Sequence, residues 1–278
     1  MAASTIDYRR PGVFTRLDAD QSPLTERLPT TPVDICKITQ GLIVHPNDAA
    51  SLPIPPERLA EKNLRGTSDI IRSLTSLDPA PLDVPRPAHL RVVGTCRHFA
   101  LVSCALLRLQ GIPARARCGF ATYFIPGKSV DHWITEYWRT DERRWVRIDS
   151  EILGQNLVAA PEDLATGEFL TGGEAWRLYR EGSVDPDSFG VAGVAHAWGA
   201  AEIRGNAIRD LAALQKIEML PWDEWGRMEA SYQGATGPDY DSLMDMIATT
   251  CADDNPEAIA KLYESEDLEV PTHMIFTS

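Results

Sequence analysis

The sequence predicts an α+β fold in which an antiparallel sheet has helices around it. Two observations support this prediction. Residues 114–149 contain three stretches with β-strand character, and a charged turn joins the last two. Helical patterns dominate the chain on both sides of this region, without the regular alternation of strands and helices that is typical of parallel sheets. We therefore expect one antiparallel sheet region flanked by helices.

The composition is that of a globular protein with an acidic surface. The chain has 278 residues, 44% of them hydrophobic, a formal net charge of −13 and a sequence pI near 4.9. A chain of this length can bury a sizeable core. Its surface repels a phosphate backbone, so we expect no nucleic-acid partner. We also expect a cytoplasmic protein without membrane contact, since no apolar run approaches roughly 20 residues and the first residues lack a signal-peptide core.

The cysteines argue against a disulfide framework and a zinc site. There are five of them, they are widely spaced, and no C-x-x-C motif occurs. An odd number at wide spacing is not typical of either arrangement. Each thiol is then either a small buried hydrophobe or a reactive group. We expect no metal ion and no organic cofactor, and the sequence indicates no oligomeric state.

Three regions follow from changes in local composition. Residues 1–34 are rich in proline, threonine and charge, and we expect an irregular N-terminal arm. Residues 35–155 contain the predicted strands and form the expected core. Residues 156–278 contain mainly helical patterns, and we expect this C-terminal region to pack on the core.

Short elements precede the sheet. Residues 34–44 have the pattern of either a helical turn or a strand, and residues 46–63 that of a loop followed by a short helix. Residues 68–78 have the spacing of an amphipathic helix. A proline-rich connector, residues 78–90, then leads to the central helix.

A buried helix is predicted over residues 95–110. Thr95 is a good N-cap, and the positions after it are mostly apolar. Gly111 suits the C-terminal end, and Pro113 prevents continuation. Cys104, in the middle of this apolar helix, is expected to be a core residue.

Three strands are predicted after this helix. Residues 114–124 alternate, with Ala114, Ala116, Cys118 and Phe120 on one face, and Cys118 is expected in the core. Residues 132–138 and 144–149 form the next two strands, joined by the turn RTDER.

Cys96 occupies the first position of the predicted helix. Unpaired backbone N–H groups and the positive end of the helix dipole favour a thiolate there. Arg97 and His98 are expected to add positive charge. The alternative is a buried structural thiol.

The predicted hairpin offers a base and an orienting acid for this thiol. If its turn is centred near Thr140 and Asp141, His132 lies opposite Asp149, with Cβ atoms roughly 5 Å apart. A one-residue slip in register moves one of the two to the other face. The alternatives are a satisfied histidine at a sheet edge and a turn carboxylate at a strand end.

Three segments together resemble the transglutaminase-like superfamily, whose core has papain-like architecture. They are G-T-C-R-H-F-A-L-V-S-C-A-L-L-R-L-Q-G-I-P-A-R, D-H-W-I-T-E-Y-W and W-V-R-I-D. The resemblance implies a nucleophile helix packed on an antiparallel sheet, here with additional C-terminal helices. It implies that Cys96 is the nucleophile, His132 the base and Asp149 the orienting acid. The family often has H-A-W where this chain has His132, Trp133 and Ile134.

The resemblance also implies an activity. We expect a cysteine-dependent amide or peptide hydrolase, or an acyltransferase, that forms a thioester intermediate. Hydrolysis is slightly favoured because water needs no second binding site. In the family a glutamine or tryptophan side chain upstream of the cysteine is often the oxyanion donor. Gln40 is the nearby upstream glutamine, and the backbone N–H of Cys96 is the preferred donor.

Residues near His132 are candidates for contact with an amide- or peptide-containing substrate. Tyr123 and Trp133 are aromatic side chains of the kind that line a groove, although they equally suit a core. Asp131 suits either tuning of the base, recognition of a cationic substrate, or a solvated surface charge.

One predicted C-terminal helix face is polar. It carries Glu202, Asn206 and Arg209, and either it lines a pocket or it joins packed helices.

Two other classes of function stay open at this point. One is a non-catalytic transglutaminase-like module that binds peptides or proteins. The other is an amide-forming tailoring enzyme whose acyl donor is bound to an acidic carrier domain. Such an enzyme needs a basic patch, and the two candidates for it are RRPG near the start and the arginines on the Cys118 strand.

Overall fold

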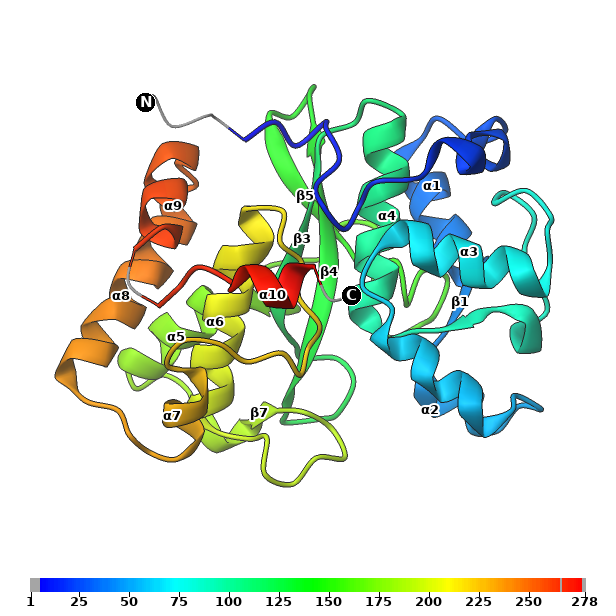
Figure 1. Cartoon of the computed structure of the whole chain (residues 1–278). Helices are drawn as coiled ribbons and strands as arrows, with labels where there is room; N and C mark the ends of the chain where they lie inside the picture. Colours follow the sequence, from blue (N-terminus) through cyan, green and yellow to red (C-terminus); the bar gives the residue numbers. More distant parts are fainter. Residues whose placement is uncertain (1–5, 266, 277–278) are drawn as a thin grey trace. The chain divides into compact units, whose positions relative to one another are not determined.

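The computed structural model describes residues 6–265 and 267–276 (Figure 1). Residues 1–5 of the predicted N-terminal arm lie outside this description, and the predicted domain boundaries stay predictions. The chain divides into two compact units that interleave along the sequence. Unit 1 comprises Met1–Ile6, Arg117–Trp133 and Ala165–Ser278, and unit 2 comprises Asp7–Ala116 and Ile134–Leu164.

Unit 2 contains the first helices. They are α1 (Pro32–Ile38), α2 (Pro46–Ala49), α3 (Thr67–Leu77) and α4 (Cys96–Leu109). Strands β1 (Ile43–Val44) and β2 (Val92–Val93) form a small parallel pair. 3₁₀ helices lie before or between these elements, at Ala19–Thr25, Thr39–Gly41, Pro56–Asn63 and Ala88–Leu90.

Helix α4 forms where the sequence predicts it. Nearly all of its 14 residues are buried, and it lies beside α1 and α3 (Figure 1). It ends at Leu109, before Gly111 at φ 73°, a conformation that favours glycine. The Thr135 hydroxyl donates to the Ala100 carbonyl at 3.2 Å, so α4 packs on the central strand of this unit.

Among the described residues, the main sheet contains five strands. Strand β3 (Ala114–Ala121) and strand β4 (Ser129–Arg139) contribute residues to both units, and β5 (Arg144–Ile148) belongs to unit 2. The strand order is β5-β4-β3-β6, and β7 pairs with β4. The predicted α+β class with a nucleophile-type helix packed on an antiparallel sheet is confirmed.

The hairpin between β4 and β5 has a different register from the predicted one. The pairs run from Thr135↔Ile148 to Arg139↔Arg144. The turn spans residues 140–143, with Arg143 in the left-handed region at φ 53°. It is centred one residue later than predicted, so every pairing partner moves by two residues. The prediction that His132 lies directly opposite Asp149 is therefore wrong.

Unit 1 contains the other strands and the C-terminal helices. Strand β6 (Phe169–Thr171) is antiparallel to β3, and β7 (Phe189–Gly190) is parallel to β4. The helices are α5 (Gly172–Arg180), α6 (Ala200–Leu214), α7 (Met228–Tyr232), α8 (Pro238–Asp253), α9 (Pro256–Tyr263) and α10 (Thr272–Ile275). In the described part of the chain, no helix has the length and apolar composition needed to cross a bilayer.

Helices α5 and α6 lie side by side (Figure 1). The contact is made by Gly172, the first residue of α5. A Cβ atom added there comes within 2.2–2.5 Å of backbone atoms of Asn206 and Ala207. Only glycine allows this approach, so Gly172 sets the position of the middle of α6.

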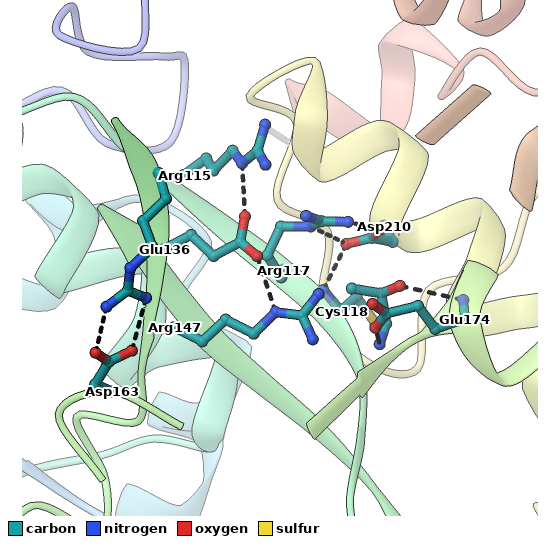
Figure 2. Close-up of polar contacts among 10 residues, drawn as sticks. Arg115, Arg117, Cys118, Glu136, Arg147, Asp163, Glu174 and Asp210 are labelled. Carbon is teal, nitrogen blue, oxygen red and sulfur yellow. Dashed lines mark hydrogen bonds and ion pairs between the residues drawn. The ribbon is translucent and has the colours of Figure 1, made fainter. Parts of the chain in front are cut away.

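The arginines of β3 are buried. In a strand with one solvated face, they are expected to be exposed on that face. Arg115 is 3% and Arg117 5% exposed. In unit 2, Arg115 donates to Glu136 at 2.7 Å (Figure 2). In unit 1, Arg117 donates to both carboxylate oxygens of Asp210, at 2.9 and 2.7 Å (Figure 2). These arginines therefore form no basic surface patch for an acidic carrier domain.

Candidate active site

Cys96 is held at the mouth of α4 by a capping interaction. The preceding residue, Thr95, has extended backbone geometry and is the N-cap. Its N–H donates to Nδ1 of His98 at 3.1 Å, and the His98 N–H donates to the Thr95 carbonyl at 2.8 Å. Gly94 leaves room for this ring, because a Cβ added there comes within 2.8 Å of His98 Cβ and Cγ. Cys96 itself is 7% exposed.

His98 is a neutral capping residue. Its Nδ1 accepts from Thr95, and its Nε2 donates to the Leu64 carbonyl at 3.0 Å, so both nitrogens are used by the neutral ring. Burial, together with the charge of Arg97, lowers the pKa of His98 to about 3. The prediction that His98 adds positive charge near the thiol is therefore wrong at neutral pH. The prediction failed because His98 is buried, and its burial is not visible in the sequence.

The lowered pKa of His98 predicts that the folded protein loses stability in acid. The pKa of His98 is about 3 in the folded protein, against about 6.5 for an unperturbed histidine, so the unfolded chain binds its proton more readily. The contribution is fully present above about pH 6.5 and is lost as pH falls toward 3. We expect the free energy of unfolding, measured by urea denaturation, to fall by a few kcal/mol over this window on account of His98.

The matched variant is His98→Gln. Glutamine at this position of a capping box can still accept from the Thr95 N–H, but it does not titrate. We expect this variant to show a flatter dependence of stability on pH between about 6.5 and 3. An equally steep dependence in His98→Gln contradicts the assignment.

Asp149 lies directly after β5 and is 1% exposed. Its N–H donates to the Pro161 carbonyl at 2.9 Å, and its Oδ1 accepts from the Glu151 N–H at 3.0 Å. Gln40 holds the following segment, because its Nε2 donates to the carbonyls of Glu151 and Leu153 at 3.2 and 2.7 Å. An amide nitrogen has two hydrogens, and both are engaged here. Gln40 therefore braces the segment after Asp149.

His132 lies on β4 with two aromatic neighbours from the β3–β4 connection. The ring centroids of Phe124 and Tyr123 lie 5.0 and 6.2 Å from that of His132, both in edge-on geometry. Tyr123 thus lies near the candidate base, and Phe124 is a neighbour that the sequence did not indicate. Trp133 is 1% exposed, and burial of this extent favours its interpretation as a core residue.

Asp131 is not a solvated surface charge. Its Oδ1 accepts from Asn206 Nδ2 at 2.7 Å. Burial, followed by the neighbouring charge of Glu202, raises the pKa of Asp131 to about 6, against the opposing effects of Arg209, Asn206 and His132. The solvated alternative is wrong because this half-buried carboxylate accepts a hydrogen bond from α6. The polar face of α6 joins packed elements, as one of the two sequence interpretations has it.

The structure sorts the predicted residues between the two units. Tyr123, Asp131, His132 and Trp133 belong to unit 1, and Cys96 and Asp149 belong to unit 2. Cys104 and Cys118 are both 0% exposed, as expected for core residues. The capping role of His98 had a signal in the sequence, namely its position three residues after Thr95.

The structure places a cysteine at the first position of a buried helix that packs on the sheet. A family model described as the transglutaminase-like superfamily matches residues 68–150. The matched residues include Cys96, His132 and Asp149.

A solved structure with partial similarity is that of a candidate cysteine protease from Cytophaga hutchinsonii. It is 17% identical, with a TM-score of 0.36, and the match covers 56% of this chain and 44% of that chain. The match therefore spans less than half of that protein. No curated protein matches the sequence.

Proposed function

We propose that the chain is a cysteine-dependent enzyme that hydrolyses an amide bond, with Cys96 as nucleophile, His132 as base and Asp149 as orienting acid. One observation carries the proposal: a transglutaminase-like domain whose capped, buried helix begins at Cys96. Backbone N–H groups and the helix dipole favour a thiolate at this position. Asp149 is a buried carboxylate at the end of the next strand pair, as the role of an orienting acid requires.

The proposed reaction has two halves. His132 takes the thiol proton while the Cys96 sulfur attacks the amide carbon, and the backbone N–H of Cys96 stabilises the resulting oxyanion. Collapse breaks the C–N bond, His132 protonates the leaving amine, and a thioester remains. His132 then takes a proton from water, which attacks the thioester. Cleavage of the C–S bond releases the carboxylic acid and restores the thiol.

Hydrolysis is preferred over the other candidate functions. Acyl transfer requires a second site for an amine, whereas water requires none. An amide-forming enzyme that meets an acidic carrier requires exposed cations. Arg115 and Arg117 are buried and paired, so Arg9 and Arg10 of the RRPG segment are the exposed arginines that remain of the two candidate clusters. A pure binding module has no use for a thiol at a capped helix start together with a buried carboxylate after β5.

The test is selective alkylation. At pH 6, iodoacetamide is expected to modify Cys96 rapidly, with peptide mass spectrometry to locate the label. Cys36 and Cys104 are 0% exposed, and burial and the nearby Cys104 raise the pKa of the Cys36 thiol, so these are expected to stay unmodified. Cys104→Ala is the matched control and should label like wild type, whereas Cys96→Ala should not label. Label spread evenly over the cysteines overturns the proposal.

The reaction type needs a second measurement. Wild-type protein is incubated with a library of peptide amides and esters, and the intact mass is followed for a covalent acyl adduct. We expect an adduct on wild type and none on Cys96→Ala. Addition of a primary amine then separates the two outcomes: free acid as the main product supports hydrolysis, and a new amide as the main product shows acyl transfer.

A further inference from the structure

Unit 1 contains a largely buried polar network that the proposed reaction does not use. We call it the α6 network, and it draws side chains from β3, β4, α6 and α7. Glu202, Asn206 and Arg209 are 2%, 0% and 1% exposed. Polar groups buried in this way are costly unless they are fully hydrogen-bonded. The members are Cys118, Asp131, Glu202, Asn206, Arg209 and Tyr232.

Asn206 is the centre of this network. Its Nδ2 donates to Asp131 Oδ1 at 2.7 Å and to the Gly119 carbonyl at 3.0 Å. Its Oδ1 accepts from Arg209 Nη1 at 3.1 Å and from Cys118 Sγ at 3.3 Å. An asparagine amide offers two donors and two acceptor positions, and all are used here. Because its oxygen faces a cation, the amide is held in one orientation.

The opposite end of the network holds Arg209 in place. Arg209 Nη1 donates to Glu202 Oε1 at 3.3 Å, and Nε donates to the Asp223 carbonyl at 3.3 Å. The Tyr232 hydroxyl donates to the second oxygen of Glu202. Burial lowers the pKa of Arg209, but the negative charge of Glu202 and its neighbours outweighs burial and raises it overall. Arg209 is therefore a fixed cation that orients the Asn206 amide.

Glycines allow the backbone to come this close. Besides Gly172, which lets α5 touch α6 at Asn206, Gly205 leaves space for the Arg209 side chain: a Cβ there comes within 2.9 Å of Nη1. At Gly119, a Cβ comes within 2.0 Å of the Leu170 carbonyl oxygen on β6. The strand that receives the Asn206 hydrogen bond is thus also fixed by close packing.

We propose that Asn206 is a positioning residue for His132 and that it acts through Asp131. This inference rests on the proposed function, in which His132 is the base. Asp131 and His132 are neighbours in β4, and neighbouring side chains of a strand point to opposite faces. The hydrogen bond from Asn206 to Asp131 therefore fixes β4 on one face, and the His132 imidazole projects from the opposite face.

The same bond also controls a charge beside the base. Asn206 donates to the Asp131 carboxylate and so favours its ionised form. A carboxylate in this place favours the protonated imidazole that forms when His132 accepts a proton. Loss of the Asn206 amide leaves Asp131 without this donor, which favours the neutral acid and weakens the effect on His132.

The test follows the protonation of His132 directly. Protein labelled with ¹⁵N-histidine is titrated by NMR, and the His132 signals are assigned by their loss in His132→Gln. In Asp131→Asn, which keeps the shape and the acceptor oxygen, we expect the His132 midpoint to move about half to one pH unit lower, a roughly 3- to 10-fold weaker proton affinity. Asn206→Leu is expected to move it in the same direction. His196, an exposed histidine of the same unit, is the internal reference and should not move.

The double variant Asp131→Asn/Asn206→Leu distinguishes positioning from general destabilisation. If Asn206 acts through Asp131, the double variant shifts the midpoint no further than Asp131→Asn alone. Equal midpoints in wild type and in Asp131→Asn, whose isosteric change keeps the fold, overturn the inference, as does an additive double variant. Alkylation of Cys96 at pH 6 is measured in parallel. If the alkylation rate depends on His132 but the His132 midpoint does not move in Asp131→Asn, this inference alone is contradicted. If the midpoint moves but Cys96 is not alkylated, the proposed function alone is contradicted.

Discussion

Replacement of His132 by alanine is expected to slow the alkylation of Cys96 at pH 6 by about 10- to 100-fold. A thiol with an unperturbed pKa of about 8.5 is only ~0.3% thiolate at pH 6, whereas a thiol paired with an imidazole is largely ionised. The weaker nucleophilicity of a low-pKa thiolate offsets part of this difference, with a Brønsted slope of about 0.4–0.5. The expected loss is therefore smaller than the change in thiolate fraction alone.

The dependence of this rate on pH provides the check. Above about pH 9 Cys96 is ionised in both wild type and His132→Ala, so their alkylation rates should converge. The variant should then react as fast as wild type or faster. His196→Ala is the matched control, because His196 is exposed and lies outside the proposed triad. Asp149→Asn should fall between wild type and His132→Ala. A His132→Ala variant that reacts like wild type at pH 6 removes His132 from the mechanism.

Asp210→Asn is expected to lower the free energy of unfolding by about 3–5 kcal/mol. Asp210 accepts two hydrogen bonds from Arg117, and its Oδ1 also accepts from the Cys118 N–H at 3.0 Å. The Arg117 and Asp210 side chains are 6% and 1% exposed. Neutralising the carboxylate removes a buried counter-charge of the Arg117 guanidinium, and such a loss costs far more than the loss of a surface pair.

Urea denaturation of matched variants measures this difference. Asp245→Asn removes the same charge from an exposed ion pair: the side chains of Arg180 and Asp245 are 44% and 47% exposed. The asparagine still offers an oxygen that accepts from the Trp176 indole N–H. We expect a change of no more than about 1 kcal/mol there. The double variant Arg117→Met/Asp210→Leu should recover part of the lost stability, because it removes both members of the buried ion pair. Equal losses in Asp210→Asn and Asp245→Asn contradict the interpretation.

The sequence by itself determined the local features of this protein. Thr95, the apolar run after it and Gly111 predicted α4, and the start of that helix placed Cys96 at its first position. Alternating residues predicted β3, β4 and β5, and their order predicted the α+β class. These signals are legible because capping, helix termination and strand alternation each depend on residues only a few positions apart.

Only the tertiary structure decided the register and the charges. In the structure a four-residue turn with Arg143 in a left-handed conformation joins β4 and β5, and each pairing partner differs by two residues from the predicted one. The sequence of a turn does not specify its centre to within one residue. Arg117 is buried because Asp210, 93 residues away, pairs with it. His98 is neutral because the fold removes it from water. Burial and long-range pairing are properties of the assembled chain, so side chains that look charged and solvated in the sequence became caps and buried ion pairs.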